Sequence, residues 1–262
     1  MFKNAVFGQY YSTDSLIHQL DPRTKIIGSI VLFISFFMYN DYRGYIFITI
    51  VLYTVIRVTE IPLKYILSCV RFVLMLIIVT MFFNLFFRKG EVIFTYKYIV
   101  FTKEGIYAAF LSGGRLLNLV IGASLLTLTT MPTGITSGLE CLFSPLAKVG
   151  VPVGAMAMMI SIVLRFIPIL FDEFHNIIKA QTVRGGDYES KNVIKRLKSL
   201  LPAMLPLFVS AFRKSNELAV AMESKGYQLK SMRSKMKPLY YLKEDYVAFF
   251  CIVFYFVIVI CL

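Results

Sequence analysis

The sequence predicts an all-α, polytopic membrane protein, with about five transmembrane helices and a cytoplasmic helical region inserted before the last span. Two observations lead to this prediction. First, 58% of the 262 residues are apolar and only 16% are charged, whereas soluble domains carry about 25% charged residues. Second, 16 of the 28 Lys and Arg residues fall between 132 and 245. An apolar chain with one concentrated basic region is typical of a protein that crosses the membrane several times.

Residues 1–131 predict a polar N-terminal arm followed by four transmembrane helices. The arm covers 1–25 and lacks the continuous apolar stretch of a cleavable signal, so we expect no cleavable signal here. The four spans fall within 26–131, where the apolar runs occupy 26–39, 44–56, 65–87 and 106–131. Because a span needs about 20 apolar residues, the first two runs either include flanking residues or form a tight hairpin.

The run 106–131 differs from the others because small residues recur along it. They are Gly113, Gly114, Gly122, Ala123 and Ser124. Small side chains let the backbones of two helices approach closely in lipid. We therefore expect another helix to pack closely against this span.

The chain changes character between 132 and 245, where basic residues and seven prolines interrupt an otherwise apolar sequence. The stretch 151–171 within this region is still apolar, and 246–262 predicts a final, uncharged span. The positive-inside rule places 132–245 in the cytoplasm, with the N-terminus on the same side and the C-terminus outside. The shorter loop 88–104 opposes this topology, because it would lie outside although it carries four cations.

Composition and motifs exclude several classes of function. The net charge of +13 is explained by cytoplasmic basic residues, so we expect no nucleic-acid partner. The sequence contains neither GxxxxGK[ST], HExxH nor GxSxG, which would indicate a nucleotide cradle, a zinc protease or a serine hydrolase. The four cysteines are far apart and predict neither disulfides nor a metal site. We therefore predict no catalytic, metal-binding or cofactor-binding residue in this chain.

One short pattern occurs twice in the basic region. The sequences 180–185, "AQTVRG", and 221–226, "AMESKG", each contain Ala, three residues, a cation and Gly. An amphipathic helical pattern precedes the first, and a stripe of small residues precedes the second. Each cation, Arg184 or Lys225, is therefore predicted at a helix end.

Two interpretations of these endings remain open. Gly commonly follows the last helical residue, and a cation near that end suits the helix dipole, so each ending is explained as an ordinary helix stop. Alternatively, the two cations form a docking pair, in which each helix end enters an acidic groove of a partner protein. The recurrence of the pattern within one basic region favours the second interpretation.

The order and spacing of several short motifs resemble the transmembrane T component of energy-coupling factor (ECF) transporters, vitamin and metal importers within the ABC superfamily. The resemblance covers most of the chain and rests on six motifs: "GQY" (8–10), "LDPRTK" (20–25), "TTMPTGITSGLE" (129–140), "RFIP" (165–168), "AQTVRGGD" (180–187) and "AMESKGY" (221–227).

The resemblance implies that 132–245 is a coupling-helix domain whose two long helices end in x-Arg-Gly motifs. Each motif would dock on one of two ABC ATPase subunits, which bind ATP and Mg²⁺, while a small membrane-embedded S component binds the substrate. The implied docking residues are Val183, Arg184, Gly185, Ser224, Lys225 and Gly226, supported by Ala180, Ala221 and Glu223. The second motif departs from the family pattern, because Lys keeps the charge of Arg but lacks its planar fork.

The expected function is therefore that of a non-catalytic coupling subunit in a bacterial cell membrane, which transmits ATP-driven movement of two ATPases to the S component. One alternative is a dedicated cobalt, nickel or biotin permease subunit of the same superfamily. Others are a conventional ABC permease, a non-transport membrane assembly protein or a lipid-modifying enzyme. The transported substrate is not readable from this sequence.

Overall fold

The computed structural model describes residues 10–11, 13–38, 42–88, 91–96, 99–185, 193–228 and 239–261. These residues confirm the all-α class, with one short β-hairpin as the exception. The elements are α1 (Leu16–Gln19), α2 (Pro22–Met38), α3 (Tyr42–Thr59), α4 (Leu63–Phe87), β1 (Val92–Tyr96), β2 (Ile99–Thr102), α5 (Lys103–Thr129), α6 (Pro132–Phe143), the 3-10 helix η1 (Ser144–Val149), α7 (Val153–Val183), α8 (Val193–Ser224) and α9 (Lys243–Cys261).

The chain divides into two compact units. The first unit contains 1–143 and 239–262, and the second contains 144–238. The domains predicted from the sequence were defined by the side of the membrane on which each segment lies: 1–25, 26–131, 132–245 and 246–262. Those boundaries remain predictions. Within the first unit, α6 packs on α2; a Cβ at Gly138 would lie 3.2 Å from Cβ of Pro22.

Four of the described helices are long and apolar enough to cross a membrane. They are α4, α5, α7 and α9, and Gly44–Thr59 within α3 is a shorter apolar helix. Three of the four, α4, α5 and α9, cover predicted spans. The fourth, α7, includes most of the apolar stretch 151–171, which we expected in the cytoplasmic or interfacial region. By length and composition, α7 also qualifies as a span.

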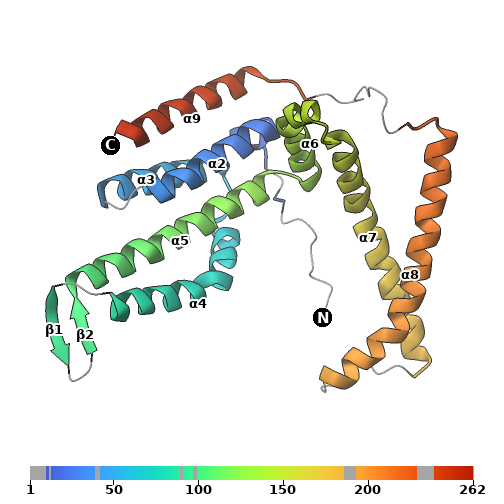
Figure 1. The fold of residues 1–262 in the computed structure, drawn as a ribbon, viewed down its shortest axis with the longest axis horizontal. Helices are drawn as coiled ribbons and strands as arrows, with labels where there is room; N and C mark the ends of the chain where they lie inside the picture. Colours follow the sequence, from blue (N-terminus) through green and yellow to red (C-terminus); the bar gives the residue numbers. More distant parts are fainter. Residues whose placement is uncertain are drawn as a thin grey trace. The chain divides into compact units, whose positions relative to one another are not determined.

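The core of the first unit lies where α2, α3, α4 and α5 meet. Phe36 of α2, Ile48 and Leu52 of α3 and Leu128 of α5 are almost fully buried there. Helices α4 and α5 run side by side (Figure 1). A Cβ at Gly113 would lie 2.6 Å from the Met81 side chain, so a larger residue here would require Met81 to move. The expectation of close packing along 106–131 is confirmed.

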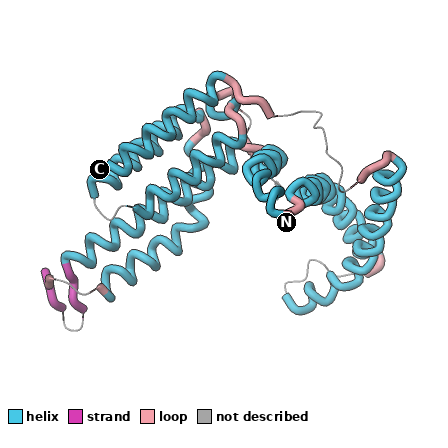
Figure 2. Tube along the Cα trace, turned by 45° about the horizontal axis from the view of Figure 1, so that its top comes forward, coloured by secondary structure: helices cyan, strands magenta, loops and turns pink. Residues whose placement is uncertain are grey.

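The hairpin occupies the predicted polar loop between α4 and α5. Strands β1 and β2 are antiparallel and lie at one end of these two helices (Figure 2). Thr102 then begins α5, because its hydroxyl oxygen accepts a hydrogen bond from the Gly105 amide at 3.1 Å. The same hydroxyl donates to the carbonyl of Arg88 at 2.9 Å, which ties the end of α4 to the start of α5.

The second unit consists of η1 and the two long helices α7 and α8. Prolines lie within both helices, namely Pro168 in α7 and Pro202 and Pro206 in α8. Each removes a backbone donor and crowds the preceding turn, which bends a helix. Accordingly, α8 bends in its N-terminal part in both views (Figures 1 and 2).

Candidate functional site

The first predicted docking motif lies at the C-terminal end of α7. The helix ends at Val183, and the amide of Arg184 still donates to the carbonyl of Gln181 at 3.1 Å. Gly185 follows with a φ of +90°, a conformation that glycine adopts without the steric cost of a Cβ. Its amide donates to the carbonyl of Thr182 at 3.0 Å. The glycine therefore turns the chain away directly after the cation.

The second motif ends α8 in the same way. The helix stops at Ser224, and Gly226 has a φ of +72°. The Gly226 amide donates to the carbonyl of Glu223 at 2.9 Å, and the Tyr227 amide donates to the carbonyl of Met222 at 3.0 Å. These two bonds define a Schellman motif, which satisfies carbonyls at the end of the helix. The interpretation of both endings as helix stops is correct as local structure.

Both helix ends are exposed. Val183 retains 90% of its surface, and the side chains of Arg184 and Lys225 are also exposed. Among the residues that the structure describes, neither cation has a side-chain hydrogen bond or ion pair. A Cβ at Gly185 or Gly226 would meet no atom within 4 Å. Both cations therefore lie at the surface of the described structure.

The two ends do not lie together. Figure 1 shows α7 and α8 crossing within the second unit, so that α7 ends at the lower edge of this unit and α8 at the upper edge. Ala180 and Ala221, four residues before the cations, are exposed in the last turns. Ala221 also accepts bonds at its carbonyl from the Lys225 amide, at 3.3 Å, and the Ser224 hydroxyl, at 3.0 Å. The structure thus presents two separated sites, each at one helix end.

A polar contact joins α7 and α8 between the two ends. Glu173 of α7 accepts hydrogen bonds from the Ser210 hydroxyl and the Lys214 ammonium, each at 3.4 Å. Ala203 is completely buried and Ser210 nearly so, and such small residues allow helices to cross closely. The crossing therefore depends on small side chains and one carboxylate, which the sequence pattern alone did not identify.

The α8 helix also carries an exposed apolar face. Its members recur at three- and four-residue intervals, which places them on one side of the helix: Leu201, Leu205, Phe208, Val209 and Phe212, with exposed fractions between 57% and 73%. Exposed apolar surface of this extent marks contact with a membrane or another protein.

Buried polar residues outside the motifs hold the first unit together, and sequence reasoning did not assign them. Asn118 of α5 is 2% exposed and donates to the Tyr45 hydroxyl at 2.7 Å and the Thr49 hydroxyl at 2.9 Å. A polar residue inside a predicted span was an available signal for such a contact. Among the described residues, no group of three or more His, Cys, Asp or Glu side chains could hold a metal ion.

Comparison with known proteins identifies the family of this chain. Residues 13–237 match the family described as cobalt transport protein, CbiQ. The chain is 42% identical to the "Energy-coupling factor transporter transmembrane protein EcfT" of Clostridium kluyveri, over 96% of this chain and 94% of that protein. It is 43% identical to the protein of the same name from Ruminiclostridium cellulolyticum, over 94% and 92%. It is 38% identical to the protein of the same name from Lactococcus lactis, over 93% of this chain and 92% of that protein.

The described helices, four of them long and apolar enough to cross a membrane, define a multi-pass helical membrane protein, and the matched family places it among transporters. With matches over nearly its whole length, the chain belongs to the CbiQ family, as an EcfT-like transmembrane component of energy-coupling factor transporters. The resemblance inferred from the six motifs is confirmed.

Proposed function

We propose that this chain is the coupling subunit of an ECF-type importer for vitamins or other micronutrients, and that its two basic helix ends dock on two partner ATPases. The observation that carries the proposal is the pair of exposed cations, Arg184 and Lys225, each directly followed by a glycine with positive φ. The ATPases bind ATP and Mg²⁺, and this chain binds neither. The chain is therefore a non-catalytic subunit that transmits movement.

The separation of the two ends supports a contact with two ATPases. Because the ends of α7 and α8 lie at opposite edges of their unit (Figure 1), each reaches a different surface. When two docked ATPases close on ATP, they move the two helix ends relative to each other. The Glu173 contacts with Ser210 and Lys214 lie at the crossing and transmit that movement between α7 and α8.

The two contacts differ in chemistry. The guanidinium of Arg184 forms a bidentate pair with a carboxylate of its ATPase, whereas the ammonium of Lys225 acts as a point charge. Val183 and Ser224, the last helical residues, border the cations, and Glu223 provides the carbonyl that accepts the Gly226 amide. We therefore expect Arg184 to contribute more binding energy than Lys225.

The exposed apolar face of α8, from Leu201 to Phe212, is the proposed contact for the S component, which carries the substrate. A lipid-facing role for part of this surface is compatible with the same chemistry, since the second unit also contains the membrane-length helix α7. In this arrangement substrate specificity resides in the S component, and the coupling region 132–245 is cytoplasmic or interfacial.

Purification of the intact chain with its partners tests the proposal. We expect two ABC ATPase subunits and one small membrane protein to co-purify with the wild-type chain. Loss of the ATPases from an Arg184→Glu variant that is still inserted in the membrane supports docking at this end. A wild-type chain that purifies without any ATPase would contradict the proposed function and favour a membrane assembly protein.

A dedicated metal importer is the second candidate, because the matched family is described as a cobalt transport protein. The three EcfT relatives reported above have names without a substrate. The number of S components decides between the candidates. A single S partner that binds cobalt, nickel or biotin would support a dedicated permease, whereas several exchangeable S partners would support a shared coupling subunit.

A further inference from the structure

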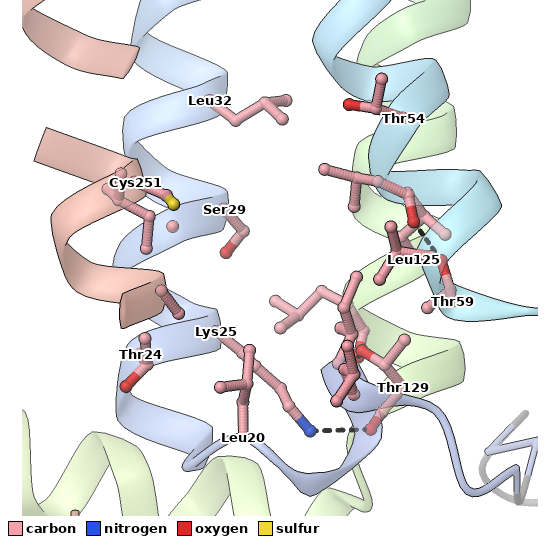
Figure 3. Close-up of a pocket in the computed structure, with 18 of the residues that line it drawn as sticks. Leu20, Thr24, Lys25, Ser29, Leu32, Thr54, Thr59, Leu125, Thr129 and Cys251 are labelled. Carbon is pink, nitrogen blue, oxygen red and sulfur yellow. Dashed lines mark hydrogen bonds between the residues drawn. The ribbon is translucent and has the colours of Figure 1, made fainter. Parts of the chain in front are cut away.

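A cavity of about 630 Å³ lies within the first unit. Figure 3 shows α2 and α9 on one side of it and α3 and α5 on the other, with Lys25 extending across one end toward Thr129. The lining continues from Lys25 to Leu32 along α2, seven residues or about 10 Å at the rise of an α-helix. The volume falls within the range of about 300–1,000 Å³ that is usual for organic ligands.

The walls of this cavity offer few polar groups to a ligand, although five lining residues carry hydroxyls in addition to Tyr255. Each of the five already donates within the protein: Ser29 to the Ile26 carbonyl at 2.9 Å, Thr54 to Val51 at 2.7 Å, Thr59 to Val55 at 2.6 Å, Thr129 to Leu126 at 3.4 Å, and Thr24 to the Asp245 carboxylate at 3.2 Å. The remaining surface is mostly aliphatic. The walls therefore suit an apolar chain.

Lys25 provides the positive charge at one end of the cavity. Among the described residues, its ammonium donates to the carbonyls of His18 at 2.9 Å and Thr129 at 3.2 Å, and these two bonds use two of its three N–H groups. No carboxylate of the described residues lies within 4.0 Å of this ammonium. Glu244 of α9 also borders the cavity, but its side chain is exposed.

We propose that this cavity binds one anionic membrane phospholipid, with its phosphate beside Lys25 and one acyl chain between the α2–α9 and α3–α5 walls. A polar nutrient does not fit, because only one donor converges on the space. The predicted topology places Lys25 at the cytoplasmic leaflet, where anionic lipids concentrate.

Native mass spectrometry of the full-length chain, purified with its partners and delipidated in detergent, tests this proposal. The probes are phosphatidylglycerol, phosphatidylcholine and inorganic phosphate. We expect one phosphatidylglycerol per chain, bound about tenfold more tightly than phosphatidylcholine, because a phosphate with uncompensated charge pairs best with the ammonium. Equal binding of the two lipids would overturn the proposal, as would displacement of the lipid by millimolar inorganic phosphate.

Variants locate the site. Lys25→Met should weaken phosphatidylglycerol binding about tenfold, while Lys25→Arg and the matched control Lys64→Met, an exposed lysine at the start of α4, should leave it unchanged. Ala248→Phe fills the cavity from α9 and should reduce binding of both lipids, which keeps the test decisive if Lys25→Met does not fold. If the Ala248→Phe variant binds both lipids as tightly as the wild-type chain does, the lipid binds outside this cavity and the proposal is wrong. Lipid binding in this cavity does not depend on ATPase docking.

Discussion

The carboxylate of Asp245 accepts a hydrogen bond from the backbone amide of Asp21 at 2.7 Å, although the two residues are 224 positions apart. Asp245 is 2% exposed and also accepts bonds from the Leu242 amide at 2.9 Å and the Thr24 hydroxyl at 3.2 Å. The same side chain therefore caps the start of α9 and joins it to the start of α2. Asp21 in turn caps α2, since its carboxylate accepts the Arg23 amide at 2.9 Å.

Replacement of this carboxylate should destabilise the first unit. Asp245→Ala leaves two backbone amides and a hydroxyl without their acceptor, which costs about 1–3 kcal/mol for each buried donor that water does not reach. We expect a clear decrease in the thermal unfolding temperature in detergent. Glu244→Ala, which removes the adjacent exposed carboxylate, is the control. Equal unfolding temperatures for the two variants would contradict a structural role for Asp245.

Charge reversal at the end of α7 should abolish transport. Arg184→Glu places a carboxylate against the acidic groove proposed on the ATPase, and loss of a buried charge pair at an interface costs about 2–5 kcal/mol. We expect substrate uptake and ATPase co-purification to be lost, while the amount of protein in the membrane is unchanged. Lys179→Glu makes the same charge change at an exposed site on the same helix. Normal substrate uptake by the Arg184→Glu variant would contradict the docking proposal.

At the end of α8, the charge should matter more than the shape of the side chain. Lys225→Arg keeps the charge and adds the planar fork, so uptake should be maintained or increased. Lys225→Glu should reduce uptake, by less than Arg184→Glu because a point-charge contact is weaker. Arg213→Glu, another exposed cation of α8, is the control. Equal uptake by the Arg and Glu variants at Lys225 would count against a charge contact at this end.

Glycine at the end of α8 should be required for the turn after Lys225. Gly226 has a φ of +72°, and a residue with a Cβ in this conformation costs about 1–2 kcal/mol. Gly226→Ala should therefore loosen the helix end, detected as faster amide hydrogen exchange at Tyr227, and should weaken ATPase co-purification. Gly154→Ala near the start of α7, where no positive φ or close neighbour is present, should change neither measurement.

Truncation of the α8 apolar face should separate the two kinds of partner. Phe212 is 69% exposed, and its replacement by Ala removes a large apolar contact without adding a charge to the membrane-facing surface. We expect less S component and an unchanged amount of ATPase to co-purify. Phe143→Ala, an exposed phenylalanine of α6, serves as the control. If the amount of S component that co-purifies with the Phe212→Ala variant is unchanged, this face contacts lipid and not the S component.

Much of the helical architecture was predictable because the solvent is the bilayer. Apolar runs such as 65–87 must form helices in lipid, since every backbone donor and acceptor needs a partner within the segment. The two helix stops were also predictable from Gly185 and Gly226, because few other residues adopt a positive φ. The hairpin Val92–Tyr96 and Ile99–Thr102 was not expected, because the six charged residues of 88–104 indicated a polar loop, although the β-branched and aromatic residues between them favour strands.

The sequence by itself determined the class of this protein: its apolarity fixes the membrane as its solvent, its six motifs indicate the family, and its two cation–glycine pairs mark two helix ends. Only the tertiary structure decided how distant residues combine. It placed Asp245 against Asp21, Asn118 against Tyr45, and Lys25 at the end of an otherwise apolar cavity. The reason is physical, because propensity and periodicity act within a helix, whereas a buried hydrogen bond or a cavity depends on which helix faces meet.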